Sequence, residues 1–235
     1  METLSPLRYL AAADWIALSY LIAGWLLVGH FTENPPKGRP SVSWLMQAYR
    51  RDWMVEFVAR DPRVFDATVL DSLRQGTSFF ASTCMIAIGG GVALIGNPKQ
   101  LQGLAGEFPL LEDATIMAQM KLLLTVLFLT NAMLKFVWSH RLFGYCAILM
   151  AAVPNDANDP QAIPRARRAG EINIHAAKNF NKGLRSIYFA LGSLGWLLGP
   201  FGLIAAATAT IFVSWRREFA SHSREVLLSG PDHGP

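Results

Sequence analysis

Residues 117–137 read MAQMKLLLTVLFLTNAMLKFV, and only Lys121 and Lys135 in this stretch carry a charge. The hydrocarbon core of a bilayer is about 30 Å thick, and an α-helix needs about 20 mostly apolar residues to cross it. Lipid offers no partner to backbone N–H and C=O groups, so a helix is the expected spanning form. Three further stretches have the same character. The four predicted spans are residues 13–31, 77–96, 117–138 and 185–213.

The composition indicates the same class of fold. Apolar residues make up 52% of the chain and charged residues 16%, whereas soluble domains carry about 25% charged residues. We predict an all-α fold, a multi-pass membrane four-helix bundle with cytoplasmic amphipathic helices. Residues 1–219 would form a single integral membrane domain, and residues 220–235 a flexible C-terminal tail.

The polar segments between the spans have the features of helices. Ser41 is placed to cap a helix that begins at Val42, because a serine oxygen can accept from the free N–H groups of a first helical turn. Cytoplasmic helical segments are predicted at about residues 41–76 and 162–184. Within the last span, the pair Gly199-Pro200 predicts a kink.

The distribution of basic residues predicts the orientation, because Lys and Arg collect in cytoplasmic loops. Fourteen lie in residues 32–76 and 140–185, against five in the other terminal and loop segments. We therefore expect a plasma membrane protein, in the bacterial inner membrane, with both termini periplasmic. Arg216 and Arg217, directly after the last span, argue against that position of the C-terminus. The basic loops also account for the net charge of +4, so no nucleic-acid partner is predicted.

Polar side chains line one face of the third span. Lys121, Thr125, Asn131, Lys135 and Ser139 fall within about a third of the helix circumference. Such groups are costly in hydrocarbon, so they should face protein, water or a headgroup region. Structural pairing is one interpretation of this polar stripe, and binding of a solute or a lipid headgroup is the other.

No group of residues points to a particular reaction. Cys84 and Cys146 lie in or beside apolar spans and are expected to be buried thiols that form no disulfide. Glu171 and His175 stand four residues apart on a predicted helix, but two candidate ligands do not make a metal site. We therefore predict no catalytic residue, no metal and no cofactor.

Arginines near the cytoplasmic membrane edge are expected to form ion pairs. Arg51, Arg74 and Arg185 lie on the same predicted side as acids that include Asp66 and Glu171. The planar guanidinium group can bond two acceptors at once. We predict that some of these pairs tie the cytoplasmic helices to the bundle.

Several short motifs are typical of one family. They are Arg51-x-Trp53, Leu73-Arg74-Gln75-Gly76, Lys121 in the third span, and Asn179-Phe180-x-x-Gly183-Leu184-Arg185 before the fourth. With them, the chain resembles the domain-of-unknown-function 599 (DUF599) family, four-span membrane proteins of bacteria and plants, from the first span to about Val213. The resemblance implies a shared architecture and carries over no activity. The candidate structural or binding residues are Arg51, Trp53, Arg74, Gln75, Lys121, Asn131, Lys135, His140, Asn179 and Arg185.

Three functional hypotheses follow. The first is a non-enzymatic scaffold, accessory subunit or assembly factor, whose partners are the lipid bilayer and either further copies of the chain or a larger membrane complex. The second is a small oligomeric channel or transporter for an anion, lined by the polar stripe. The third is a membrane enzyme, for which Glu171, His175 and His140 are the available groups.

Overall fold

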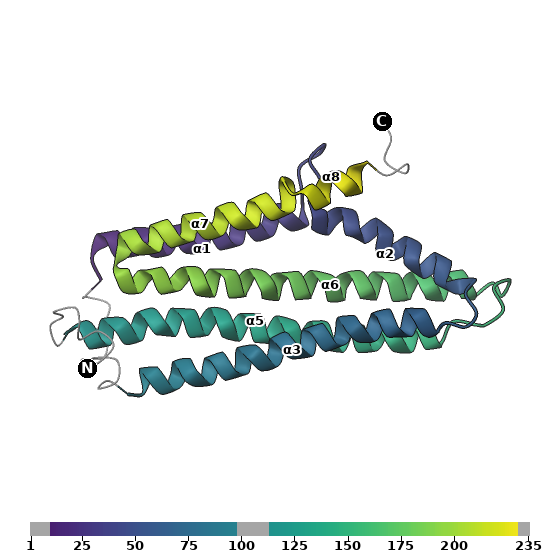
Figure 1. The fold of residues 1–235 in the computed structure, drawn as a ribbon, viewed down its shortest axis with the longest axis horizontal. Helices are drawn as coiled ribbons and strands as arrows, with labels where there is room; N and C mark the ends of the chain where they lie inside the picture. The colour runs from purple at the N-terminus through teal and green to yellow at the C-terminus, as the bar shows by residue number, and fades with distance from the viewer. Residues whose placement is uncertain (1–9, 98–112, 230–235) are drawn as a thin grey trace. The chain divides into compact units, whose positions relative to one another are not determined.

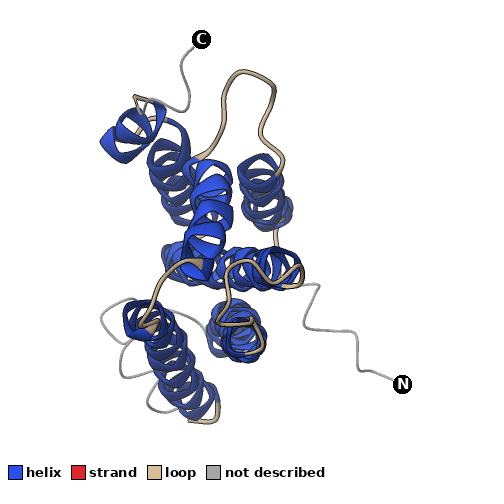
Figure 2. Cartoon of the chain, turned by 90° about the vertical axis from the view of Figure 1, so that its right-hand side faces the viewer, coloured by secondary structure: helices blue, strands red, loops and turns tan. Residues whose placement is uncertain are grey.

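The computed structural model describes residues 10–97 and 113–229 of the chain. Within these residues every regular element is a helix, which confirms the all-α class (Figures 1 and 2). The elements in chain order are α1 (Ala12–Glu33), α2 (Val42–Val58), α3 (Val64–Ile95), α5 (Asp113–Ala151), α6 (Ala162–Ser193), the 3-10 helix η2 (Leu194–Leu198), α7 (Pro200–Phe219) and α8 (His222–Leu228).

Three of the described helices are long and apolar enough to cross a membrane. They are Ala12–Glu33, Val64–Ile95 and, within α5, Ile116–Ala151, and they contain almost all of the first three predicted spans. Helix α3 has 32 residues and α5 has 39. At 1.5 Å per residue their lengths are about 48 Å and about 58 Å. Both helices are therefore longer than a hydrocarbon core of about 30 Å requires.

The predicted fourth span, residues 185–213, is wrong as a single helix. Helix α6 ends at Ser193, η2 follows, and the chain reverses at Gly199 before α7 begins at Pro200 (Figure 1). Gly199 has a φ of +97°, a conformation that glycine adopts at no steric cost. Pro200 lacks the N–H that a continuing helix would need, but suits the first position of a new one. The Gly-Pro pair therefore ends one helix and starts an antiparallel one.

Glycines in the last turns before the reversal allow the two helices to pack closely. A Cβ atom on Gly192 would lie 2.7 Å from Thr210 Oγ1, and one on Gly195 would lie 2.6 Å from Ala206 Cβ. These separations are too short for real Cβ contacts. Small residues allow helix backbones to approach closely in this way, and here they form a helical hairpin.

The predicted flexible tail, residues 220–235, is wrong for residues 222–228, which form α8. The N-cap Ser221 accepts a hydrogen bond from the backbone N–H of Arg224. The Arg224 side chain donates from Nε to the Pro40 carbonyl oxygen at 2.8 Å. These contacts hold α8 against the loop before α2. Residues 230–235 lie outside the described part of the chain.

The predicted cap at Ser41 is confirmed. Helix α2 begins at Val42, and Ser41 Oγ accepts from the backbone N–H of Trp44 at 3.1 Å. The same hydroxyl group donates to the Thr32 carbonyl oxygen at 2.7 Å. Ser41 therefore starts α2 and also joins it to the last turn of α1.

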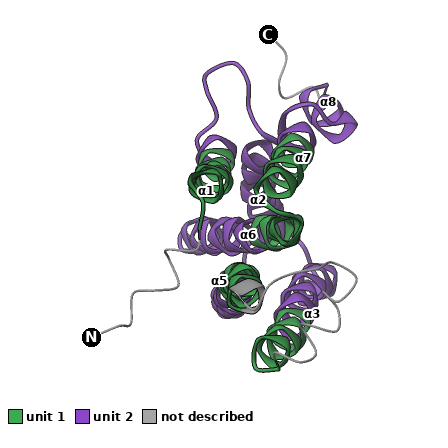
Figure 3. Ribbon diagram, turned by 90° about the vertical axis from the view of Figure 1, so that its left-hand side faces the viewer, with its two compact units in different colours: residues 1–29, 83–132, 184–214 green, residues 30–82, 133–183, 215–235 purple. Residues whose placement is uncertain are grey.

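The chain forms two compact units, and five helices contribute residues to both (Figure 3). Unit 1 comprises Met1–Gly29, Thr83–Ala132 and Leu184–Ser214, and unit 2 comprises His30–Ser82, Met133–Gly183 and Trp215–Pro235.

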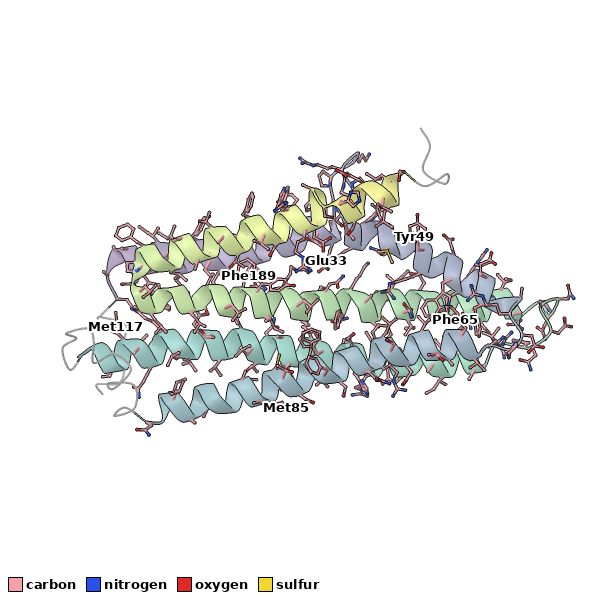
Figure 4. The ribbon with its side chains drawn as sticks, in the orientation of Figure 1. Glu33, Tyr49, Phe65, Met85, Met117 and Phe189 are labelled. Carbon is pink, nitrogen blue, oxygen red and sulfur yellow. The ribbon has the colours of Figure 1, made fainter. Side chains whose placement is uncertain are left out.

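Each unit has an apolar core of its own. The core of unit 1 includes Leu21, Phe189 and Leu203, and Met117 packs against it; Phe189 on α6 and Met117 on α5 are labelled in Figure 4. The core of unit 2 joins α2, α3, α5 and α6. Its buried residues include Met54, Phe57, Leu70, Phe143, Met150 and Ala166.

We expect Gly195→Ala to destabilise the helical hairpin, because the added methyl group would collide with Ala206 and with the Gly202 carbonyl oxygen. Overpacking of this kind costs about 1–3 kcal/mol. The control is Gly89→Ala on α3, where an added Cβ meets nothing within 4 Å. Unfolding free energies from SDS titration in mild detergent should fall for Gly195→Ala and stay level or rise for Gly89→Ala. Equal stability of the two variants would contradict the close packing.

Candidate functional site

An ion pair on the outside of unit 2 joins α2 to α6. Arg51 Nε lies 2.6 Å from Glu171 Oε1, and Arg51 Nη2 donates to Glu171 Oε2 at 3.3 Å. The hydrogen bond lowers the pKa of Glu171 and raises that of Arg51. Both side chains are 51% exposed, and exposed pairs contribute at most about 1 kcal/mol. The predicted ion pairing is confirmed for Arg51, and its role is mainly to orient the two helices.

The neighbouring Arg50 points into the core of unit 2. Its Nη1 donates to Oδ1 of Asn173, a fully buried residue on α6. Asn173 Nδ2 in turn donates to the Cys146 sulfur at 3.6 Å. Burial lowers the pKa of Arg50. Sequence reasoning missed this contact, because nothing in the pattern distinguishes Asn173 from the other polar residues of α6.

Trp53, of the Arg51-x-Trp53 motif, donates a hydrogen bond to a buried carboxylate. Its Nε1 donates to Asp66 Oδ1 at 2.7 Å, and Arg60 Nη1 lies 2.6 Å from the same oxygen. The Asp66 side chain is fully buried. Its other oxygen, Oδ2, has no hydrogen-bond partner within the described residues. Asp66 therefore links α2, the α2–α3 connection and the first turns of α3.

A cavity of about 460 Å³ lies beside this cluster in unit 2. Its polar lining is Arg63, Asp71, Arg74 and Asn155, and its apolar lining includes Phe57, Leu70 and Met150. Arg74 belongs to one of the sequence motifs, whereas Arg63 does not. One face of α3 and the facing turns of α5 form most of the cavity wall. The sequence does not predict that these two helices enclose a cavity here.

The two cavity arginines differ in their bonding. Arg63 donates to the carbonyl oxygens of Val153 at 2.9 Å and Pro154 at 2.8 Å. Its guanidinium group also lies 4.5 Å from the centre of the Phe57 ring. Arg74 Nε is buried and has no hydrogen-bond partner within the described residues. A buried donor without a hydrogen-bond partner destabilises the fold by about 1–3 kcal/mol. Packing alone therefore does not explain why an arginine stands at position 74.

His140 contacts the backbone of the same turn of α3. Its Nδ1 lies 3.4 Å from the Arg74 carbonyl oxygen and 3.3 Å from Thr77 Oγ1. Donation to the carbonyl oxygen requires the proton on Nδ1. His140 therefore joins α5 to the end of the Leu73–Gly76 motif.

The polar stripe of α5 packs against α6 in unit 1. Asn131 Nδ2 donates to Ser186 Oγ at 2.7 Å, and the hydroxyl groups of Thr125 and Ser193 lie 2.7 Å apart. Lys121 Nζ lies 5.9 Å from the centre of the Trp196 ring. Within unit 1, these side chains of the polar stripe therefore contact other protein groups.

Trp196 has a second polar contact, with the first turn of α1. Its Nε1 donates to Asp14 Oδ1 at 2.7 Å, and the carboxylate also accepts from the Ala11 N–H at 3.2 Å. Asp14 is buried in unit 1. The acid at the start of the first predicted span is therefore satisfied inside the protein.

Two of the other candidate residues bond within their own helices. Gln75 donates to Asp71 and Asn179 to the His175 carbonyl oxygen, each within its own helix. Lys135 is half-buried in unit 2, and Arg185 is buried in unit 1. Cys84 and Cys146 are free buried thiols, as predicted. Among the described residues, no group of three or more His, Cys, Asp or Glu side chains is placed to hold a metal ion.

The fold defines an all-helical protein with apolar helices of membrane-spanning length. The particular family follows from a family model described as "Protein of unknown function, DUF599", which matches residues 16–223. The chain belongs to this family, and the resemblance found in its motifs is confirmed. No curated protein and no solved structure matches the chain.

We expect Asp66→Ala to destabilise the protein by about 2–3 kcal/mol, because it leaves Trp53 Nε1 and the Arg60 guanidinium group without their acceptor. The matched control is Asp52→Ala, which removes an exposed carboxylate from α2 and should cost less than about 0.5 kcal/mol. Asp66→Asn keeps one acceptor oxygen and should fall between them. SDS titration measures the free energy of unfolding of each variant. Equal values for all three variants would show that the bonds from Trp53 and Arg60 to Asp66 do not stabilise the protein.

Proposed function

We propose that this protein is a non-enzymatic integral membrane protein that acts as a scaffold, accessory subunit or assembly factor in the plasma membrane, the inner membrane of a bacterium. The apolar parts of α1, α3, α5, α6 and α7 lie in the bilayer, and the polar segments of unit 2 lie on the cytoplasmic side. Its partners are lipid and either further copies of the chain or a larger membrane complex.

The contacts of the polar stripe are the observation that carries this proposal. Asn131 and Thr125 bond to serines of α6, and Phe128 between them lies 6.3 Å from Phe189, centre to centre. A transport path needs polar groups that remain available to a solute, whereas a packing face needs them paired. The pairing supports a structural role for the stripe over the anion channel.

The surface of unit 1 supports a lipid environment. Each of its five helices exposes at least one large apolar side chain, for example Ile16, Ile86, Leu127, Leu191 and Phe212. Four of the 21 Lys and Arg residues fall in unit 1, namely Arg8, Lys99, Lys121 and Arg185, and the other 17 fall in unit 2. By the positive-inside rule, the basic segments of unit 2 belong on the cytoplasmic side.

The chain reversal changes the expected position of the C-terminus. In unit 2, Glu218 accepts from the backbone N–H of Ser43 at 3.0 Å and from its hydroxyl group at 2.8 Å. The last turn of α7 therefore lies beside the start of α2, in the segment assigned to the cytoplasm. We place the C-terminus inside and the N-terminus outside, which moves Arg216 and Arg217 to the cytoplasmic side.

This topology predicts the labelling of three cysteine variants in spheroplasts of a bacterial host by an impermeant thiol reagent. Glu107→Cys, outside the described residues, should react without permeabilisation. Ala157→Cys and Ser223→Cys, both at exposed positions, should react only after it. The unmodified protein is the control, because both native thiols are buried. Labelling of Ser223→Cys in intact spheroplasts would contradict this topology and place the C-terminus on the periplasmic side.

The structural role of the stripe predicts that a Lys121→Met/Lys135→Met variant folds and keeps its assembly. Methionine retains the apolar length and removes the charge, and the loss of the Lys121–Trp196 contact should cost less than about 1 kcal/mol. The control is Lys37→Met at an exposed position. Native mass spectrometry after mild extraction reports the complex, and chloride flux in proteoliposomes reports transport.

Equal complexes and no flux in any variant support the scaffold. A wild-type chloride flux that the double variant alone loses, while remaining folded, supports the channel instead. A chain extracted only as a monomer, without flux, contradicts both assignments.

A further inference from the structure

The cavity of unit 2 has one long wall built by a single face of α3. Arg63 lies directly before the first residue of the helix, and the residues of the helix on this wall are Ala67, Leu70, Asp71 and Arg74. Their spacing follows the period of an α-helix, so their side chains project to the same side. Ala147, Met150 and Ala151 line the opposite wall from α5. The volume of about 460 Å³ lies in the range of small-molecule sites.

The charges in the lining favour an anion. Arg63 and Arg74 contribute two positive charges and Asp71 one negative charge, so the lining is formally a cation of +1. The Asp71 carboxylate accepts from Gln75 at 2.6 Å, and neither arginine forms an ion pair with a described carboxylate. Arg63 donates its N–H groups to backbone carbonyl oxygens, so no described carboxylate is paired with its positive charge.

Arg74 supplies the donors for that anion. Its side chain lines the cavity and is only partly buried, and its Nε has no hydrogen-bond partner among the described residues. A guanidinium group binds carboxylate and phosphate oxygens with paired N–H donors. The Phe57, Leu70 and Met150 side chains line the same cavity and offer apolar contact to whatever carries the oxyanion.

We propose that this cavity binds a monoanionic amphiphile, in which a phosphodiester or carboxylate group bonds Arg74 and an attached apolar group lies against Phe57, Leu70 and Met150. A lipid headgroup region or a soluble ester could supply this chemistry. Arg74 stands three residues before the predicted span 77–96, which favours a lipid. This site goes beyond the scaffold function and does not depend on it.

The test uses the full-length protein in mild detergent and a fluorescent short-chain phosphatidylglycerol, followed by anisotropy. Arg74→Gln removes the charge and should weaken binding about tenfold or more. Arg167→Gln is the matched control, because it removes the same charge from an exposed position of unit 2 and should bind as the wild type does. A phosphatidylcholine with the same chains, which has no net charge, should bind more weakly than phosphatidylglycerol.

A second variant keeps the experiment decisive if Arg74→Gln does not fold. Ala67→Trp fills the cavity from an exposed position of α3 and leaves both arginines in place, so it should also lose binding. Competition then identifies the source of the oxyanion. Displacement of the probe by inorganic phosphate assigns a soluble ligand, and displacement by unlabelled phosphatidylglycerol alone assigns a lipid.

The proposal is overturned by wild-type affinity in folded Arg74→Gln or in Ala67→Trp, by equal losses in Arg74→Gln and Arg167→Gln, or by equal binding of phosphatidylcholine and phosphatidylglycerol. None of these outcomes bears on the scaffold, which the labelling and flux experiments test separately.

Discussion

Hydrogen bonds between α6 and its neighbours are the interaction on which both units depend. In unit 1, Ser186 and Ser193 of α6 bond Asn131 and Thr125 of α5. In unit 2, Asn173 bonds Arg50 of α2, and the Ala176 carbonyl oxygen accepts from Ser139 of α5 at 2.7 Å. An unpaired buried polar group costs about 1–3 kcal/mol, so these pairs set which faces of the helices meet.

Glycine decides how near those helices come. Gly183 of α6 faces the Phe136 ring, where an added Cβ would lie 2.7 Å from a ring carbon. Phe136 also stacks on Phe80, with ring centres 5.3 Å apart. Gly192 and Gly195 play the same part in the helical hairpin. Without water to drive apolar groups together, close packing and interhelical hydrogen bonds provide most of the association energy of membrane helices.

The two proposals rest on different consequences of this packing. In unit 1, pairing with α6 satisfies the polar stripe of α5 and supports a structural role. In unit 2, the packing leaves Arg74 Nε without a hydrogen-bond partner among the described residues, and its side chain lines a cavity. A buried polar group that lacks a partner in an otherwise well-paired structure marks a candidate ligand site. The same chain can therefore combine a non-enzymatic framework with a site for an anionic amphiphile.

Local patterns in the sequence determined the helical class, three apolar helices, the cap at Ser41 and the family, because each depends on residues close together in the chain. Charge alone predicted that some of the arginines near the membrane edge form ion pairs, and the structure supplied the pairing of Arg51 with Glu171. Tertiary structure decided the reversal at Gly199, since a Gly-Pro pair permits either a kink or a turn and packing selects between them. It also decided that Asp66 takes Trp53 and Arg60 and that Arg74 Nε has no hydrogen-bond partner among the described residues. Such contacts depend on distances between helices, which hydrophobic periodicity does not encode.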